Sequence, residues 1–210
     1  YMEWLVNTVQ EAVDAPCCID SPDPKVVEKG IDAHKGTPMI NSISLESERF
    51  NSMIPILEGT DMKVIALAMS DEGMPYTKDD RMKIAGQLID KLVQHRVKLE
   101  NIYVDPLVQP IGSGDHLGRE FLNTVEALHQ KYDGINTICG MSNISYGIPK
   151  RKLANQVFMV MAITKGLNSA ILNPLDKRMM ASITAAEMLA GKDEYCMNYV
   201  EAYRNGQFEW

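Results

Sequence analysis

Four polar residues stand at the ends of short apolar runs, and their types suit the binding of one flat, polar ligand. Asp20, Asn41, Asp105 and Asn143 each follow or lie within such a run, and Ser142 precedes the last of them. Carboxylates accept hydrogen bonds from amino and amide N–H groups, while Asn both donates and accepts without carrying charge. Any one of these residues alone is also typical of a turn. Together they predict a pocket for a heterocycle with alternating donors and acceptors.

Other chemistries fit this set of residues less well. The sequence contains neither a GxGxxG nor a GxxxxGK loop, so a phosphate cradle is not expected. Asp20 and Asp105 without a nearby histidine would make a weak divalent metal site. The four cysteines form no CxxC pair, and we expect free thiols. Nucleophilic catalysis of the Ser-His-Asp type lacks support, since no histidine follows a strand. His34, His95 and His129 are expected on helix surfaces and His116 in a loop.

A repeated strand-loop-helix pattern is expected to position these polar residues. Apolar runs that read as buried parallel strands alternate with amphipathic stretches. Each polar residue then falls at the carboxyl end of a strand, where parallel α/β folds bind their ligands. The strands are expected at residues 16–19, 39–44, 63–69, 101–107, 136–141 and 169–174. The helices are expected at residues 1–13, 24–34, 46–57, 78–95, up to 132, 152–165, 177–190 and 193–205.

Two α/β architectures fit six such repeats: a doubly wound sheet, or a (β/α)₈ TIM barrel. The chain opens with an uncapped helical pattern, in which Trp4, Leu5, Val9, Ala12 and Val13 can share one face. A barrel of ordinary size would result if the first two strands were missing from this chain. The sequence contains no linker or shift in composition, so residues 1–210 are predicted to form one domain that supplies strands 3 to 8.

Composition limits the partners of this domain. The 210 residues carry a formal net charge of −7 and no Lys/Arg run long enough to suggest a nucleic-acid surface. No apolar stretch is long enough to predict a membrane-spanning segment or a signal peptide. We therefore expect a cytoplasmic protein with neither nucleic-acid nor membrane partners.

Four segments, in order along nearly the whole chain, resemble the pterin-binding TIM-barrel family. They are IDSPDP at residues 19–24, NSIS at 41–44, YVDPL at 103–107 and GMSNISYGIP at 140–149. The last segment is most similar to the branch of methyltetrahydrofolate:corrinoid methyltransferases, which includes the folate module of cobalamin-dependent methionine synthase. The single Asp and Asn motifs are weak signals alone, whereas SNISYGIP is a strong one.

This resemblance implies a barrel that holds a pterin at its mouth. By position, Asp20, Asn41 and Asp105 would bind the pterin's amino, amide and ring N–H groups, and Ser142 and Asn143 complete the implied substrate-binding residues. Asn143 would lie near N5, which carries the transferred methyl group, and would assist catalysis there. The implied substrate is methyltetrahydrofolate or tetrahydrofolate, and the implied partner is a separate protein carrying a corrinoid (cobalamin). The resemblance implies no metal in this chain, transfer in either direction, and a homodimer.

Two alternatives remain open at this point. A dihydropteroate synthase-like enzyme is the first, although that branch uses a Ser-Arg-Lys-type segment and an Arg-x-His after its last two strands. This chain instead has Ser142-Asn143-Ile144 and Asn173-Pro174-Leu175 at the corresponding places. The second alternative is a non-catalytic barrel that binds folate or docks a corrinoid protein.

Overall fold

The computed structural model describes residues 1–208 and alternates strands with helices along the chain. Helix α1 comes first, and five strand-helix units follow it before two final helices. The strands are β1 (Cys18–Asp20), β2 (Met39–Leu45), β3 (Lys63–Ser70), β4 (Ile102–Asp105) and β5 (Asn136–Thr137). The α-helices are α1 (Met2–Ala12), α2 (Pro24–Ala33), α3 (Ser47–Leu57), α4 (Lys78–Gln94), α5 (Leu117–Lys131), α6 (Arg151–Thr164), α7 (Lys177–Leu189) and α8 (Met197–Arg204).

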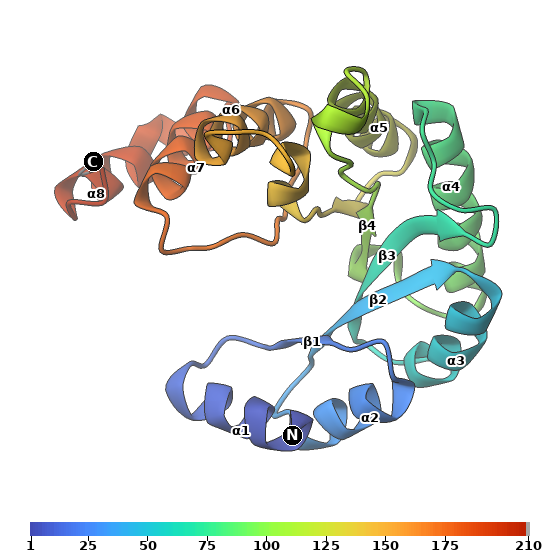
Figure 1. The fold of residues 1–210 in the computed structure, drawn as a ribbon. Helices are drawn as coiled ribbons and strands as arrows, with labels where there is room; N and C mark the ends of the chain where they lie inside the picture. The colour runs from blue at the N-terminus through green and yellow to red at the C-terminus, as the bar shows by residue number, and fades with distance from the viewer. Residues whose placement is uncertain (209–210) are drawn as a thin grey trace.

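The five strands form one parallel sheet in the order β1-β2-β3-β4-β5. Each strand pairs with the next in sequence, and the helices lie outside the curved row of strands (Figure 1). Consecutive parallel neighbours with helices on the outer face are the arrangement of a TIM barrel rather than of a doubly wound sheet. The fold is therefore part of a (β/α)₈ barrel, as expected. The prediction of a single domain over residues 1–210 stays a prediction, and its last two residues lie outside the described part.

The sixth predicted strand, at residues 169–174, was wrong as a full strand. It is reduced to a parallel bridge between Ile171 and Gly140. The segment nevertheless runs beside β5, because the N–H of Ser169 donates to Thr137 O at 3.1 Å and that of Ile171 to Cys139 O at 2.8 Å. β5 is also shorter than expected, since the chain turns into a 3₁₀ helix, η3 (Met141–Ser145), where an extended strand and loop were predicted.

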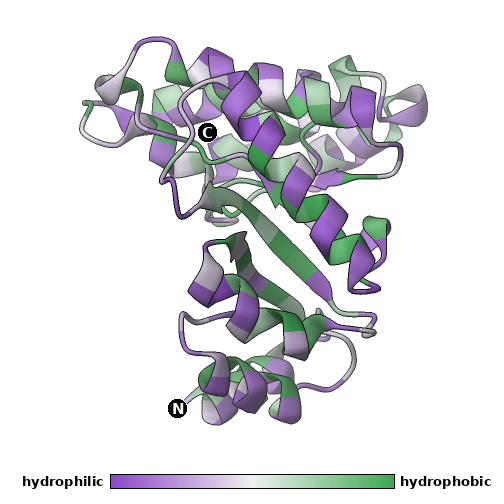
Figure 2. Ribbon diagram, turned by 90° about the vertical axis from the view of Figure 1, so that its right-hand side faces the viewer, coloured by the Kyte–Doolittle hydropathy of each residue, from purple (hydrophilic) through white to green (hydrophobic). Residues whose placement is uncertain are grey.

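Alternation along the strands decides which side chains face the inside of the curve. Ile19, Ile40 and Val104 are buried in a core with residues of the outer helices. Because successive side chains on a strand point to opposite faces, the next residues, Asp20, Asn41 and Asp105, point to the concave face. Figure 2 shows the strongly hydrophobic strands behind helices that are hydrophobic on one side and hydrophilic on the other.

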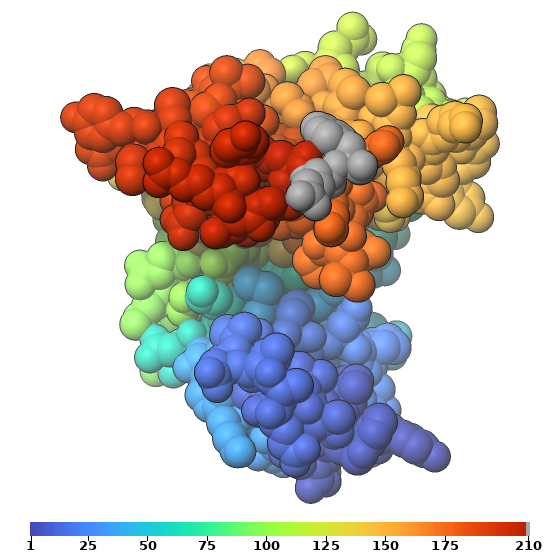
Figure 3. Space-filling model, turned by 90° about the vertical axis from the view of Figure 1, so that its left-hand side faces the viewer, coloured from blue at the N-terminus to red at the C-terminus, as the bar shows by residue number. Residues whose placement is uncertain are grey.

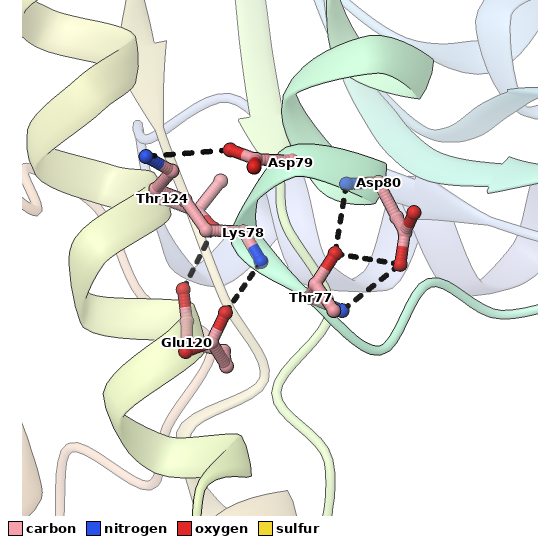
Figure 4. Close-up of polar contacts among 6 residues, drawn as sticks. All are labelled: Thr77, Lys78, Asp79, Asp80, Glu120 and Thr124. Atoms are coloured by element: carbon pink, nitrogen blue, oxygen red, sulfur yellow. Dashed lines mark hydrogen bonds and ion pairs between the residues drawn. The ribbon is translucent and has the colours of Figure 1, made fainter.

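Helix α4 begins at a well-capped turn beside the loop that follows β3 (Figure 4). Thr77 Oγ1 accepts from the N–H of Asp80 at 3.1 Å, and the Asp80 carboxylate accepts from the N–H of Thr77 at 3.1 Å. This reciprocal pair is a capping box. Glu120 of α5 adds a third cap by accepting from the N–H of Lys78 at 2.6 Å. The start of α4 is thereby fixed to α5.

Helix α1 differs from the sequence expectation in what its apolar residues contact. Trp4, Leu5 and Val9 were expected to share a packed face, but they are 66, 50 and 37% exposed, and only Val6 of this helix is buried. The physical reason is the position of the helix. It packs mainly on α2, and β1 is the edge strand of the described sheet, so no described strand covers its apolar side.

Candidate functional site

Asp20 and Asn41 lie side by side at the ends of two neighbouring strands. Their Cα atoms are register partners in the β1–β2 pair, so both side chains project from the same face. Within residues 1–208 neither side chain makes a hydrogen bond to another residue. Asp20 is exposed and Asn41 is half-buried. These two polar groups are therefore available to a ligand on the concave face.

Asp105 lies at the end of β4 and is almost completely buried, with 8% of its surface exposed. Burial raises the pKa of its carboxyl to about 7, while hydrogen bonds from the backbone N–H groups of Leu107 and Gly140 partly offset that effect. The bond from Leu107 is 2.8 Å long. A carboxyl with a pKa near 7 changes its charge within the physiological range, so its ability to accept hydrogen bonds depends on pH.

Asn143 lies in η3, three residues beyond Gly140, and the backbone N–H of Gly140 donates to Asp105. Its Nδ2 lies 3.3 Å from the place where a Cβ on Gly140 would be, so the amide folds closely over that glycine. Asn143 is exposed, and its side-chain amide finds no hydrogen-bond partner among the described residues. Asp105 and Asn143 thus meet around Gly140, and both have hydrogen-bonding capacity left for a ligand.

Ser142 is exposed beside Asn143, and its backbone carbonyl accepts two hydrogen bonds that hold this segment. Its carbonyl accepts from Ser145 Oγ at 3.2 Å and from Arg151 Nη2 at 2.8 Å. The structure thus forms two polar pairs, Asp20 with Asn41 and Asp105 with Asn143, at the carboxyl ends of strands in one curved sheet. No direct contact joins the two pairs within residues 1–208.

Two arginines that cannot be recognised from the sequence, Arg49 and Arg81, hold the backbone around this site. Arg49 donates to the carbonyls of Ser21, Pro22 and Ser42 at 2.7–3.1 Å, which links the loop after β1 to strand β2. Burial lowers the pKa of Arg49, and the carboxylates of Asp20 and Glu46 partly offset the change. This arginine therefore joins the backbone next to Asp20 to the backbone next to Asn41.

Arg81 holds the backbone that follows Asp105. It is fully buried in the first turns of α4, and its Nε donates to Pro106 O and its Nη1 to Tyr76 O at 2.8 and 2.7 Å. It thereby ties the loop after β4 to the loop after β3. Leu107 of that loop adopts a left-handed conformation (φ 63°), which is uncommon for a residue other than glycine. The arginine contacts and the Asp105–Leu107 bond together hold this turn.

Cysteine and histidine chemistry finds no support at the site. All four cysteines are free thiols. Desolvation, with smaller contributions from Asp20 and Cys17, raises the pKa of Cys18 to about 11, and burial raises that of Cys139. Neither thiol is therefore a thiolate at neutral pH. His34 and His129 were expected on the surface, but they are half-buried and structural: His34 Nε2 accepts from the N–H of Cys17, and His129 contacts Thr137 Oγ1.

Two further findings concern the rest of the described chain. A groove of about 740 Å³ lies between α4 and the loop after β3, and none of the predicted site residues lines it. Asp71, which borders the groove, caps α3 by accepting from the N–H of Ser47, and its hydrogen bonds with Ser47 lower its pKa.

Among residues 1–208, no three His, Cys, Asp or Glu side chains gather where they could hold a metal ion, and no helix is long and apolar enough to cross a membrane.

Comparison with known proteins places this architecture in a family. The model of the family described as "Pterin binding enzyme" matches residues 1–173. The chain is 31% identical over 208 residues to the methylcorrinoid:tetrahydrofolate methyltransferase of Eubacterium limosum, covering 98% of this chain and 77% of that protein. It is 27% identical over 184 residues to the methionine synthase of Mycobacterium tuberculosis, but that match spans only 15% of the larger protein.

Solved structures of dihydropteroate synthases share the fold of this chain. Dihydropteroate synthase from Yersinia pestis, in complex with a sulfonamide drug, superposes with a TM-score of 0.72 at 14% identity, covering 90% of this chain and 72% of that one. Dihydropteroate synthase from Coxiella burnetii, in complex with pteroic acid, gives the same TM-score at 13% identity and the same coverage. At such identities the likeness establishes the barrel alone. Since the family model matches most of its length, the chain belongs to the pterin-binding enzymes.

Proposed function

We propose that this protein is a methyltransferase that moves a methyl group between N5 of tetrahydrofolate and the cobalt of a corrinoid carried by a separate protein. The observation that carries the proposal is the unpartnered, uncharged amide of Asn143 beside the buried Asp105, in a chain 31% identical to a methylcorrinoid:tetrahydrofolate methyltransferase. Folate and the corrinoid are both substrates in this proposal. The expected cytoplasmic location and homodimer stay predictions, although α6 does expose Leu153, Val157 and Met161 along one side.

The binding of the pterin is assigned to the acceptors on the concave face. A pterin presents amino, amide and ring N–H groups along one edge, and Asp20, Asn41 and Asp105 all offer oxygen acceptors. Asp105 would contribute most, because hydrogen bonds to an ionised and buried carboxylate are stronger than neutral ones. Arg49 and Arg81 hold the loops behind these residues, so the acceptors are positioned before the ligand arrives.

The chemical step is assigned to Asn143. A cobalt(I) centre forms a new bond to the methyl carbon, and the electron pair of the broken carbon–nitrogen bond stays on N5. A tertiary amine is a poor leaving group, so N5 takes up a proton from solvent and gains positive character as the bond breaks; in the reverse direction this proton returns to solvent. A neutral amide that hydrogen-bonds at N5 stabilises this developing charge without holding the product by a fixed charge. The reverse reaction passes through the same transition state, so one site serves both directions.

A spectroscopic experiment tests the proposed reaction. The full-length protein is mixed with methyltetrahydrofolate and a reduced corrinoid protein, and we expect the cobalt(I) absorbance to disappear as methylcobalt forms. A binding measurement with methyltetrahydrofolate alone accompanies it. If folate binds but the cobalt(I) spectrum persists with several corrinoid proteins, the non-catalytic alternative is correct and the methyltransferase proposal is wrong.

The dihydropteroate synthase alternative is not favoured by any observation at the site. Its members match this chain at 13–16% identity, which establishes the fold alone. Asn143 and Asn173 occupy the places that correspond to the basic residues of that branch. The carboxamide of Asn173 is used in a local turn, because its Oδ1 accepts from the N–H of Leu175 at 3.0 Å.

Gly140→Ala tests whether the position of Asn143 matters for the rate. A Cβ at this position would lie 3.3 Å from Asn143 Nδ2, so the amide must move by a few tenths of an ångström. We expect kcat to fall roughly fivefold with little change in the Kd of folate, because small misplacements of a catalytic group cost rate. Gly112→Ala is the matched control, since a Cβ there meets nothing closer than 3.9 Å. Equal rates for Gly140→Ala and Gly112→Ala would contradict the expectation.

A further inference from the structure

Helix η3, which carries Asn143, is a short element whose own hydrogen bonds hold it weakly. A 3₁₀ helix has poorer hydrogen-bond geometry than an α-helix, and η3 has only five residues. The N–H of Asn143 donates to Gly140 O at 3.2 Å, and that of Tyr146 donates to Asn143 O at 3.1 Å, at the long end of the usual range. The exact place of the Asn143 amide therefore depends on contacts from outside η3.

The buried side of η3 contains one polar side chain, that of Ser145. Ser145 is fully buried, whereas Ser142 and Asn143 on the other side are exposed. A buried hydroxyl without a partner would cost about 1–3 kcal/mol. The hydroxyl of Ser145 has two partners, because its Oγ donates to Ser142 O at 3.2 Å and accepts from Arg151 Nε at 3.0 Å.

Arg151 completes a ring of three hydrogen bonds with Ser142 and Ser145. Its Nε donates to Ser145 Oγ, and its Nη2 donates to Ser142 O at 2.8 Å. Nε and Nη2 form one edge of the rigid guanidinium fork, a geometry that lysine cannot reproduce. The guanidinium carbon also lies 5.9 Å from the centre of the Tyr146 ring. We call the side chains of Ser145 and Arg151 the clamp.

The clamp holds the peptide unit that joins Ser142 to Asn143. A peptide unit is planar, so Ser142 O, Asn143 N and Asn143 Cα lie in one plane. The clamp holds the carbonyl edge of this plane, and the hydrogen bond from the N–H of Asn143 to Gly140 O holds the opposite edge. With both edges held, the plane cannot rotate and Asn143 Cα stays in place. The amide can then turn only about its own side-chain bonds, above Gly140.

The chain turns sharply before α6 and so brings Arg151 back against η3. α6 begins at Arg151, and the preceding Lys150 adopts a left-handed conformation (φ 55°). This conformation is uncommon for a residue other than glycine and persists where the surrounding structure requires it. η3 packs against α6, and Figure 3 shows the segment around residue 150 (gold) at the surface beside the orange and red C-terminal helices. The turn at Lys150 thus places the arginine against the segment that carries Asn143.

We propose that Ser145 and Arg151 are positioning residues for methyl transfer, which act by fixing the place of the Asn143 amide. This inference rests on the proposed function, because that function assigns the chemical step to Asn143. The clamp does not need to touch the reacting atoms. A catalytic group that is displaced by a fraction of an ångström loses rate even when the substrate binds as before. Loss of the clamp should therefore lower kcat and leave the Kd of folate nearly unchanged.

Single-turnover methyl transfer from methyltetrahydrofolate to a cobalt(I) corrinoid protein, with calorimetry of folate binding, tests the clamp in the full-length protein. We expect Ser145→Ala to lower the rate roughly five- to twentyfold with little change in the folate Kd. Arg151→Lys keeps the charge but loses the fork, so it should lower the rate to a similar extent. The double variant should be little slower than either single variant, because residues that act as a unit are not additive.

A second measurement separates positioning of Asn143 from a general structural effect. If the clamp acts through Asn143, Ser145→Ala should cause no further loss of rate when it is added to Asn143→Ala. Thr124→Val is the matched control, because Thr124 is fully buried on α5 and its hydroxyl donates to Glu120 O at 2.7 Å. This control should lower the melting temperature about as much as Ser145→Ala does and leave the rate of methyl transfer unchanged.

Three results would contradict the clamp. They are a parental rate in Ser145→Ala, a loss of rate that adds in full to that of Asn143→Ala, and a weaker folate Kd with an unchanged rate at saturating folate. In each of these cases methyl transfer by the parent leaves the proposed function standing. A parent that binds folate but transfers no methyl group would overturn the proposed function and this inference together, so the two failures can be told apart.

Discussion

Replacing Asn143 with alanine is expected to lower the rate of methyl transfer by roughly 10²- to 10³-fold while folate binds with nearly unchanged affinity. The estimate takes the cost of removing one positioned hydrogen-bonding group beside a developing charge, about 2.7–4 kcal/mol of transition-state stabilisation. Asn143 is exposed, and its amide has no protein partner among the described residues, so its removal breaks no internal hydrogen bond. The variant should therefore fold normally, and a loss of rate can be assigned to the chemical step.

Single-turnover mixing of enzyme-bound methyltetrahydrofolate with a cobalt(I) corrinoid protein measures this step directly. The folate Kd is determined in parallel by calorimetry. Asn198→Ala provides a matched control, because Asn198 is an exposed asparagine on α8 whose side chain has no hydrogen bond within residues 1–208. If Asn143→Ala turns over like the parent, Asn143 has no part in the mechanism. If both the rate and the affinity collapse, its role is in binding rather than in catalysis.

The order of strands and helices could be predicted because each strand is a short apolar run ending in a polar turn. The run at residues 63–69 corresponds to β3, and the predicted helix at residues 78–95 corresponds to α4, with Leu88, Ile89 and Leu92 buried as expected. The orientation of Asp20, Asn41 and Asp105 also follows from sequence, since strand alternation puts each on the face opposite an apolar neighbour.

The features that could not be predicted depend on contacts between distant segments. The apolar run at residues 136–141 is typical of a strand, but only its first two residues are in β5, because η3 begins at Met141 and brings Asn143 over Gly140. A buried Arg81 cannot be recognised from sequence, since its acceptors lie on Tyr76 and on Pro106, which is 25 positions away.

Asp105→Asn is expected to make the ligand-free protein more stable at pH 8 and, at the same time, a poorer binder of folate. The native carboxyl has a pKa of about 7, whereas its ordinary value is 3.8. Between these values an unfolded chain is ionised and the native state holds its proton, so stability falls as pH rises from about 4 to about 7 and is level above that. The loss is on the order of 4 kcal/mol as an upper value, and asparagine, which does not ionise, avoids it.

Urea unfolding of the ligand-free protein at pH 5 and pH 8 measures the stability half of this prediction. The difference between Asp105→Asn and the parent should be larger at pH 8 and shrink towards pH 5. Asp133→Asn is the control, because Asp133 is exposed and has no hydrogen-bond or ion-pair partner among the described residues. Equal pH dependence in Asp105→Asn and the parent would show that Asp105 does not carry the raised pKa.

The ionisation of Asp105 should also affect folate binding: the affinity should rise with pH, whereas the stability of the ligand-free protein falls. Ring and amino N–H groups donate to the ionised form, so the affinity of the parent should rise with pH and become level above about 7. At pH 8 the Asp105→Asn variant should bind roughly 10- to 150-fold more weakly, the equivalent of about 1.5–3 kcal/mol for a hydrogen bond to a charged group. Its affinity should also be nearly independent of pH between 6 and 8. If Asp105→Asn gains stability and loses affinity, Asp105 is a group whose burial lowers stability and favours ligand recognition. If the affinity of the variant at pH 8 is unchanged, Asp105 is not part of the pterin site.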